Sequence, residues 1–266
     1  MIEPGTLGII GVGSIGGSIA LAAQRRGWST IGYDRDPLAS DCESPRDVYD
    51  RADVLVIATH LESSLRLLRE LAVTPPARAR LILDVASVKV PTLDAAAGLA
   101  YFVASHPMAG TERSGRAAAS AELFDGRAWA YVPSGDGALN ERARAFIEQL
   151  GARPFAVDPY VHDRVVALTS HVPQVAASAV AAHVRELAQN AGEGVVDALC
   201  GPAARELLRL SRSGVDMWRD ILHANAAEVA PQLRTIAEEL LAIARALEDG
   251  DNGAIERAFA RGNPSR

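Results

Sequence analysis

The chain has 266 residues, a formal net charge of −6 and interspersed acidic and basic residues, so it offers no basic stripe to follow a nucleic-acid backbone. Its cysteines, Cys42 and Cys200, are too few for a disulfide framework and lack the spacing of metal ligands, which favours a reducing compartment and predicts no metal site. No signal-like segment and no membrane-spanning apolar run is expected. Composition thus indicates a cytoplasmic protein that binds neither nucleic acid nor membrane.

Apolar runs that alternate with helical patterns predict an α/β domain in the first part of the chain. The runs are continuous, which is typical of strands buried on both faces of a mainly parallel sheet with ligands at the carboxyl ends. The predicted strands are residues 7–10, 29–33, 54–59, 81–85, 101–104, 128–132 and 154–157.

The first predicted strand leads into the glycine-rich segment GVGSIG at residues 11–16, and a helical pattern follows. Gly11 permits a tight turn, Gly13 lets a pyrophosphate approach the backbone, and Gly16 lets the helix pack closely on the strand. The backbone N–H groups at the start of this helix can then bind phosphate oxygens. The segment therefore predicts a dinucleotide site.

Asp34 follows the second predicted strand, at the interval expected for the residue that binds the adenosine ribose. Its carboxylate would accept hydrogen bonds from both ribose hydroxyls and repel a 2′-phosphate, which predicts NAD rather than NADP. Adjacent Arg35 could instead pair with a 2′-phosphate, so NADP stays open. The cofactor is also expected to contact Ser14 and Ile15 in the glycine turn and Thr59 at a later strand end.

The histidine His106 follows the predicted strand 101–104 within a glycine-rich segment. Near neutral pH an imidazole can accept or release a proton, so a histidine at a strand end downstream of a dinucleotide turn indicates catalysis. Asp34, Thr59 and Ser87 also fall at or just past strand ends. These side chains are expected along the carboxyl edge of the sheet.

After about Asp158 the chain is rich in Ala, Leu, Glu and Arg and shows no strand pattern. The sequence therefore predicts a dinucleotide-binding Rossmann-type domain over residues 1–157 and an all-helical domain over residues 158–266. The first helix of the second domain is expected to run from His162 to about Asn190. Apolar stripes on such helices are often buried against a second copy of the chain.

Further motifs follow the glycine turn in order: LDVASVK at 83–89, the segment 104–115 around His106, TSHVPQ at 169–174, RLS at 209–211, and MWRDI at 217–221 with Asn225 beyond. Together with the glycine turn they resemble the prephenate/arogenate dehydrogenase family, and the resemblance covers nearly the whole chain. It implies a homodimer formed through the helical domain. It also implies oxidative decarboxylation of prephenate to 4-hydroxyphenylpyruvate, or of arogenate to tyrosine, in tyrosine biosynthesis.

In the implied chemistry a hydride leaves the carbinol carbon for the nicotinamide while the ring carboxylate departs as carbon dioxide, so the protein has to remove or share the hydroxyl proton. His106 is the predicted proton acceptor. Ser87 is expected to bridge the substrate hydroxyl, His106 and the nicotinamide, and it could equally cap the helix that follows it.

The resemblance also places Arg209 where the family binds a substrate carboxylate, a task suited to the bidentate, permanently charged guanidinium. Ser170 and His171 are expected across the cleft as substrate-binding residues. Gln174 stands where many members have a second histidine, and it can form hydrogen bonds but carry no proton charge. Trp218 either walls the site or packs in the core of the dimer.

Several features near the motifs carry alternatives. Lys89 could add positive potential to the site but is expected to be a solvated lysine. Glu112 could approach Arg209 and gate the cleft, or it could be a surface acid. Residues 35–52 are shorter than the corresponding family segment, which holds a helix and a strand, and His60 has no assigned role.

Three other functions fit parts of the sequence. An amino-substituted prephenate from a specialised pathway could be the substrate, and a hydroxyacid or imine reductase would share the Rossmann domain followed by helices. A non-catalytic nucleotide-binding sensor would explain the short segment 35–52 and Gln174. The presence of Ser87, His106 and Arg209 in matching positions argues against the sensor.

Overall fold

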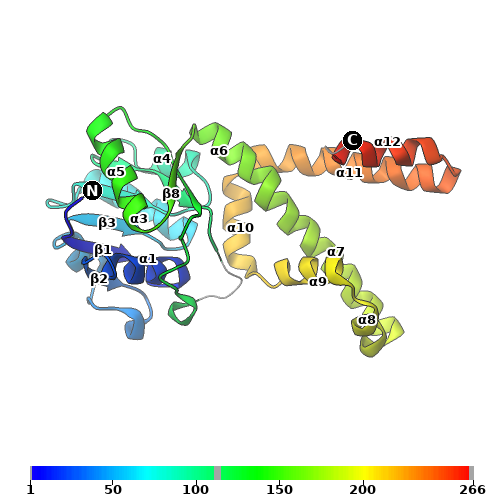
Figure 1. The fold of residues 1–266 in the computed structure, drawn as a ribbon, viewed down its shortest axis with the longest axis horizontal. Coiled ribbons are helices and arrows are strands. Elements are labelled where there is room, and N and C mark those ends of the chain that lie inside the picture. The colour runs from blue at the N-terminus through cyan, green and yellow to red at the C-terminus, as the bar shows by residue number, and fades with distance from the viewer. Residues whose placement is uncertain (1, 111–114, 264–266) are drawn as a thin grey trace.

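The computed structural model describes residues 2–110 and 115–263 and divides into an α/β part and an extended helical part (Figure 1). The α/β part is built on a five-stranded parallel sheet with the strand order β2-β1-β3-β4-β5. Apart from the edge strand β2, its strands are almost wholly buried apolar runs, as predicted. They are β1 (Thr6–Ile10), β2 (Ser29–Tyr33), β3 (Val54–Ile57), β4 (Leu81–Asp84) and β5 (Phe102–Val103).

Helices cover both faces of this sheet. Apolar residues of α1 and α5, such as Ile19 and Phe146, pack on one face, and those of α3, such as Leu65 and Leu68, pack on the other. Opposite faces are covered because right-handed crossovers join parallel strands. The helices are α1 (Ser14–Gln24), α2 (Pro45–Tyr49), α3 (Leu61–Val73), α4 (Val90–Ala95) and α5 (Gly137–Gln149), with the 3₁₀ turns η1 (Pro37–Ala39) and η2 (Arg116–Ala118).

The short connection predicted at residues 35–52 holds only η1 and α2 and contains no strand. Ser44 and Asp47 form a reciprocal capping box that starts α2 immediately after a loop. As a result, β3 follows directly and pairs with β1, with Leu7 opposite Val54.

The prediction that His106 follows the end of a strand over residues 101–104 is wrong. The chain leaves the parallel sheet after β5 and enters a second sheet. There, His106 lies within β6, opposite Ala130 of β7 in an antiparallel pair. The second sheet has the order β6-β7-β8, with strands β6 (Ser105–Pro107), β7 (Ala128–Tyr131) and β8 (Arg153–Ala156).

Ser105 accounts for this change of sheet. Its backbone N–H donates to Asp84 Oδ1 at 2.8 Å and its hydroxyl donates to the Asp84 carbonyl oxygen at 2.6 Å. The indole of Trp129 on β7 in turn donates to the Ser105 hydroxyl at 3.0 Å. These buried bonds attach β6 to the end of β4, so His106 lies beside the carboxyl edge of the parallel sheet.

The helical part begins at Pro159, with Asp158 as N-cap. Its long first helical stretch, which comprises α6, η3 and α7, ends at Ala191, and the C-cap Gly192 adopts φ 95°. The long helix expected from His162 is confirmed. A π-helical turn interrupts it just before Pro173, which has no N–H to donate back to Thr169. The elements are α6 (Pro159–Val166), η3 (Ala167–His171), α7 (Val172–Ala191), α8 (Glu193–Leu199), α9 (Pro202–Leu210), α10 (Val215–Ala224), α11 (Ala226–Asp249) and α12 (Asn252–Gly262).

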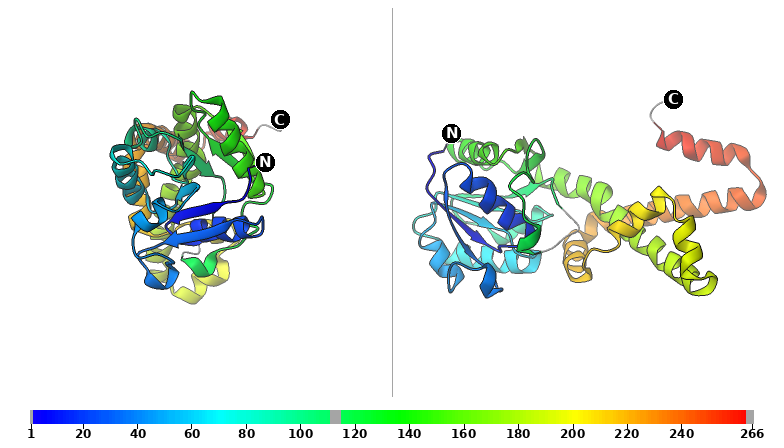
Figure 2. Two further views of the ribbon diagram at one scale, coloured as in Figure 1. Left: turned by 90° about the vertical axis from the view of Figure 1, so that its left-hand side faces the viewer. Right: turned by 60° about the horizontal axis from the view of Figure 1, so that its bottom comes forward.

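This helical part buries little of its apolar surface within one chain. Its own core cluster contains Ala167, Val172 and Val229 as buried members. Leu240, with 62% of its surface exposed, and Phe259, with 71%, lie on α11 and α12, which extend away from the α/β part (Figure 2). The long helices therefore present unpartnered apolar faces.

The helical stretch Pro159–Ala191 is long enough to cross a membrane, and an 18-residue segment within it is apolar enough, with a mean hydropathy of 1.4, by length and composition alone. The expectation that no segment reaches this threshold was therefore wrong. The same stretch carries the buried polar residues His162, Asp163 and His171 and packs against α9 and α11. We interpret it as the central helix of the helical part, because its polar residues have partners within this molecule.

Candidate active site

The glycine turn between β1 and α1 has the geometry of a pyrophosphate cradle. Gly11 adopts φ 93°, and a side chain there would meet the Ala58 carbonyl oxygen at 2.6 Å. A Cβ at Gly16 would collide with the Gly11 carbonyl oxygen, whereas the space beside Gly13 is open. The Ser14 hydroxyl is buried without a hydrogen-bond partner in the described structure. Open space and an unsatisfied hydroxyl at a helix N-terminus fit a bound phosphate.

Asp34 lies at the end of β2 beside this turn, as predicted. Its Oδ2 atom accepts a hydrogen bond from the Val12 N–H at 2.7 Å, and its Oδ1 atom accepts one from the Asp36 N–H at 3.0 Å. Each oxygen keeps a second lone pair for a ribose hydroxyl. Thr59 follows β3, where its hydroxyl lies 2.9 Å from that of Ser64.

His106 is half-buried and faces the helical part. Burial of its ring and the positive charge of Lys89 lower the pKa of His106 well below the ordinary value of 6.5, and His162 and His171 add to this effect when they are charged. The imidazole is therefore neutral at pH 7 and can accept a proton. Its Nδ1 atom lies 3.0 Å from His162 Nε2.

Lys89 is not solvated, contrary to the prediction from its sequence context. Its side chain is wholly buried, and its Nζ atom donates to Asp84 Oδ2 at 2.5 Å and to the Ser105 carbonyl oxygen at 2.6 Å. Burial raises the pKa of Asp84 and lowers that of Lys89, while the ion pair between them opposes both shifts. This pair joins β4, β6 and the turn that contains Ser87.

The sequence analysis missed two residues of the site, His162 and Asp163 at the start of the long helix. They are 4% and 3% exposed, and His162 Nδ1 lies 2.7 Å from Asp163 Oδ1. The signal was present, because two adjacent polar residues lie on the inward face of a helix that is otherwise apolar there. Only the packing of α6 against β6 shows that His162 reaches His106.

His171 is buried at the end of the π-helical turn, where it contacts Trp218 edge to face with ring centroids 5.9 Å apart. The Asn225 amide nitrogen donates to the Asp163 carbonyl oxygen at 2.8 Å and lies 3.2 Å from His171 Nδ1. Nδ1 therefore accepts, and the proton of neutral His171 is on Nε2, a buried atom without a partner in the described structure. Burial lowers the pKa of His171 to about 4.

The other predicted substrate residues differ in their exposure and contacts. Ser87 is half-buried in the turn between β4 and α4, and Ser170 is exposed. Arg209, near the end of α9, is 41% exposed in its side chain and pairs with Glu206, with Nη2 and Oε1 2.5 Å apart. Gln174 is buried and donates to the Leu210 carbonyl oxygen at 2.9 Å, so it attaches α7 to the end of α9 beside Arg209.

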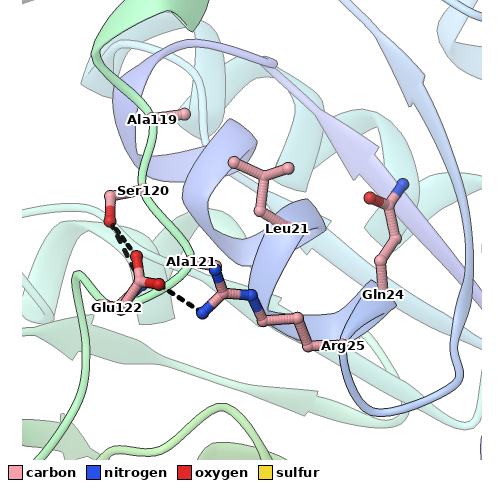
Figure 3. Close-up of a pocket in the computed structure, with 7 residues that line it drawn as sticks. All are labelled: Leu21, Gln24, Arg25, Ala119, Ser120, Ala121 and Glu122. Atoms are coloured by element: carbon pink, nitrogen blue, oxygen red, sulfur yellow. Dashed lines mark hydrogen bonds and ion pairs between the residues drawn. The ribbon is translucent and has the colours of Figure 1, made fainter.

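Other features do not add to the site. Glu112 lies outside the described residues. Among residues 2–110 and 115–263, no group of three or more His, Cys, Asp or Glu side chains is arranged to hold a metal ion. A shallow pocket of about 550 Å³ lies beside α1 and is flanked by the ion pair of Arg25 with Glu122 (Figure 3). None of the predicted site residues lines it.

A pyrophosphate cradle in a parallel-sheet domain, combined with a neutral histidine where that domain meets a helical one, is typical of nicotinamide-dependent dehydrogenases. Two family models match most of the chain. The nucleotide-binding domain of prephenate dehydrogenase matches residues 19–155, and the dimerization domain of prephenate dehydrogenase matches residues 158–261. The chain belongs to the prephenate dehydrogenase family.

Individual relatives agree with this assignment. A Streptomyces niveus protein named "Probable prephenate dehydrogenase NovF" is 36% identical over 93% of this chain and 71% of its own length. The prephenate dehydrogenase of Bacillus subtilis (strain 168) is 30% identical over 96% of this chain and 73% of its own length. A crystal structure of prephenate dehydrogenase from A. aeolicus in complex with hydroxyphenyl propionate and NAD⁺ has the same fold, with a TM-score of 0.83, 22% identity and coverage of 98% and 97% of the two chains.

Proposed function

We propose that this chain catalyses the NAD-dependent oxidative decarboxylation of prephenate to 4-hydroxyphenylpyruvate, a step in tyrosine formation. The observation that carries the proposal is His106, an imidazole with a depressed pKa at the junction of the two domains, in a chain whose family is defined by this reaction. Its free cysteines, Cys42 and Cys200, suit a reducing cytoplasm.

In the proposed reaction, His106 accepts the proton of the substrate hydroxyl as the C–H bond of the carbinol carbon breaks. The nicotinamide, when bound, supplies the hydride acceptor. When the ring carboxylate leaves as carbon dioxide, the electron pair of the broken C–C bond makes the ring aromatic, and the ring oxygen takes the proton back from His106 to give the phenol of the product. Lys89 favours the neutral form of His106 before the reaction, because a second positive charge nearby would be repelled.

The substrate carries two carboxylates, and we assign one of them to Arg209, which would exchange its ion pair with Glu206 for the substrate. The buried Nε2–H of His171 is a donor available for a substrate oxygen. Ser87 lies in the turn held by Lys89 and Asp84. Its hydroxyl can form a hydrogen bond with the substrate or cap the helix that follows. Arogenate and amino-substituted prephenate share the ring carboxylate. The side-chain pocket therefore decides between prephenate and arogenate, whereas a prephenate with its amino group on the ring is distinguished beside His106.

NAD is the proposed cofactor because Asp34 places a carboxylate where NADP carries its 2′-phosphate. Its two existing hydrogen bonds fix its position beside the glycine turn. Turnover efficiency should therefore be higher with NAD than with NADP. A preference for NADP would assign the pocket to Arg35 and leave Asp34 with the role of a turn cap.

The decisive experiment is incubation of the purified protein with NAD and prephenate, recording NADH absorbance and the release of 4-hydroxyphenylpyruvate. Arogenate is assayed in parallel. His106→Asn should lower turnover by about two to four orders of magnitude with little change in the Michaelis constant. The exposed residue His223, on α10 and outside the faces assigned to the dimer, provides a matched control, His223→Asn. Absence of product from all tested cyclohexadienols, with cofactor binding intact, would contradict the proposed function.

We also infer a homodimer formed through the helical part. The apolar side chains exposed on α7, α8, α11 and α12 are more than a water-facing domain of this size needs. A two-fold contact between copies would bury these faces.

A further inference from the structure

We propose that His162 and Asp163 are positioning residues that fix the tautomer of His106 and direct its Nε2 atom to the substrate. The proposal rests on the proposed function in one respect, the role of His106 as proton acceptor. Three side chains form a continuous hydrogen-bonded chain. His106 Nδ1 lies 3.0 Å from His162 Nε2, and His162 Nδ1 lies 2.7 Å from Asp163 Oδ1.

The contacts of Asp163 determine which atom donates and which accepts in each of these hydrogen bonds. Its Oδ1 atom accepts the Lys89 backbone N–H at 2.7 Å, and its Oδ2 atom accepts the Val90 N–H at 2.9 Å. A carboxylate that already accepts at both oxygens can only accept from the imidazole as well, so the proton between Asp163 and His162 belongs to His162 Nδ1.

The remaining protons are then determined. A neutral imidazole with its proton on Nδ1 has a lone pair on Nε2, so His162 Nε2 accepts and His106 Nδ1 donates. Neutral His106 therefore keeps its proton on Nδ1, and its Nε2 lone pair is free. Nε2 is the atom that takes the hydroxyl proton in the proposed reaction.

The same hydrogen bonds stabilise the protonated His106 that this proton transfer produces. When Nε2 gains a proton, His106 becomes a cation in a site that already holds the charge of Lys89. Its Nδ1–H remains bonded to His162, whose other nitrogen is bonded to the Asp163 carboxylate, so the negative charge polarises the chain toward the cation. Only the substrate proton moves, and the protons on both Nδ1 atoms stay in place.

The positioning residues are held rigidly from both domains. The Asp163 carboxylate binds the first backbone N–H groups of α4 in the α/β part, and its carbonyl oxygen accepts from Asn225 in the helical part. The ring of His162 meets that of His106 at 65°, with centroids 5.2 Å apart. Domain packing, rather than local sequence, thus sets the orientation of the base.

Two variants of His162 separate positioning from bulk. Glutamine carries an acceptor and a donor on one carbon, as the imidazole ring does, so His162→Gln can still accept from His106 and donate to Asp163. His162→Leu can do neither. Removing such an orienting partner typically costs about 10- to 100-fold in activity, so we expect the leucine variant to lose that much kcat while the Michaelis constant for prephenate stays nearly constant. The glutamine variant should recover most of the loss.

A spectroscopic readout makes the test independent of turnover. Long-range ¹H–¹⁵N spectra of histidine-labelled full-length protein distinguish protonated from unprotonated ring nitrogens, and His106→Asn identifies the His106 signals. The wild type and His162→Gln should show the proton on Nδ1 of His106, and His162→Leu should lose this preference. His223→Leu, at an exposed site on α10, controls for loss of a histidine, and circular dichroism reports whether each variant folds.

The outcomes are distinct. An Nε2–H tautomer of His106 in the wild type, or a folded leucine variant with wild-type kcat, would overturn the positioning role. Should the wild type fail to oxidise prephenate yet show the Nδ1–H tautomer, the hydrogen-bonded chain is supported and the proposed function fails. Loss of activity in the leucine variant with recovery in the glutamine variant supports both.

Discussion

At the scale of single residues, His106 is subject to two opposing influences. Burial and the charge of Lys89 disfavour the imidazolium. The proposed donation of the His106 Nδ1–H to a neutral His162, which Asp163 orients, favours it. The net direction is a lowered pKa. A base of this kind is fully available at neutral pH and gains its charge only when the substrate delivers a proton.

The first prediction concerns pH. Because the pKa of His106 is lowered, the neutral form persists as pH falls through the ordinary histidine value of 6.5 and is lost only below it. The profile of kcat/KM at saturating NAD should therefore stay level through pH 6.5 and decline at lower pH. Circular dichroism at each pH separates this decline from unfolding. An acid limb centred at or above 6.5, without unfolding, would contradict a depressed pKa for the essential base.

The second prediction concerns the carboxylate site. Losing one partner of a charged hydrogen-bonded pair costs about 2 to 5 kcal/mol, so Arg209→Ala should raise the Michaelis constant for prephenate well over tenfold and leave cofactor affinity nearly unchanged. Arg209→Lys should rescue little, because an ammonium cannot reproduce the planar fork.

Steady-state kinetics with varied prephenate checks this result, and Arg212→Ala, in the exposed turn after the same helix, is the matched control. If Arg209→Ala binds prephenate normally, a neighbouring arginine holds the carboxylate, and Arg209 is not the carboxylate-binding residue of the helical part.

At the scale of elements, the buried pair of Asp84 and Lys89 explains how two sheets meet at the site. Asp84 ends β4 and accepts from Lys89, Ser105 and Ala86, so one carboxylate fixes the start of β6 and the turn that contains Ser87. Each of these donors is buried. Removing the charge of Asp84 or of Lys89 would therefore leave the other as an unpaired buried charge.

The third prediction follows from this arrangement. Lys89→Met should lower the free energy of unfolding by about 3 to 5 kcal/mol, because it leaves a buried carboxylate unpaired. The double variant Asp84→Asn/Lys89→Met should lose less than the single one. Urea unfolding at a fixed protein concentration measures both. The exposed pair of Arg78 with Asp53 supplies the control, since Arg78→Ala should cost no more than about 1 kcal/mol. Equal losses for Lys89→Met and Arg78→Ala would show that burial does not govern this pair.

The glycine turn, the buried strands and the long helix could be predicted from sequence because each depends on local sterics and apolar periodicity. The burial of Lys89 could not, since it depends on a carboxylate five residues earlier and on a carbonyl group of another strand. The split between the two sheets likewise depends on Ser105 bonding across to β4. The contact of His106 with His162 joins residues 56 positions apart and requires both domains.

At the scale of the whole molecule, the helical part has too small a core for its length. Its buried apolar cluster is centred on α11, η3 and the start of α7, while the far halves of α7 and α11 expose leucines and valines. A second copy of the chain is the simplest partner for these faces, since a two-fold axis lets one apolar stripe cover its own equivalent.

The last prediction tests this interface. Leu240 and Leu241 on α11 are 62% and 58% exposed in the single chain. The double variant Leu240→Glu/Leu241→Glu should convert a dimer into monomers, because association would bury four unpaired carboxylates per dimer. Sedimentation velocity over a concentration series measures the change. Leu38→Glu, 93% exposed on η1 in the α/β part, should leave the dimer intact. A monomeric wild type, or a dimer that survives both glutamates, would place the interface elsewhere or remove it, and the exposed leucines would then need another partner.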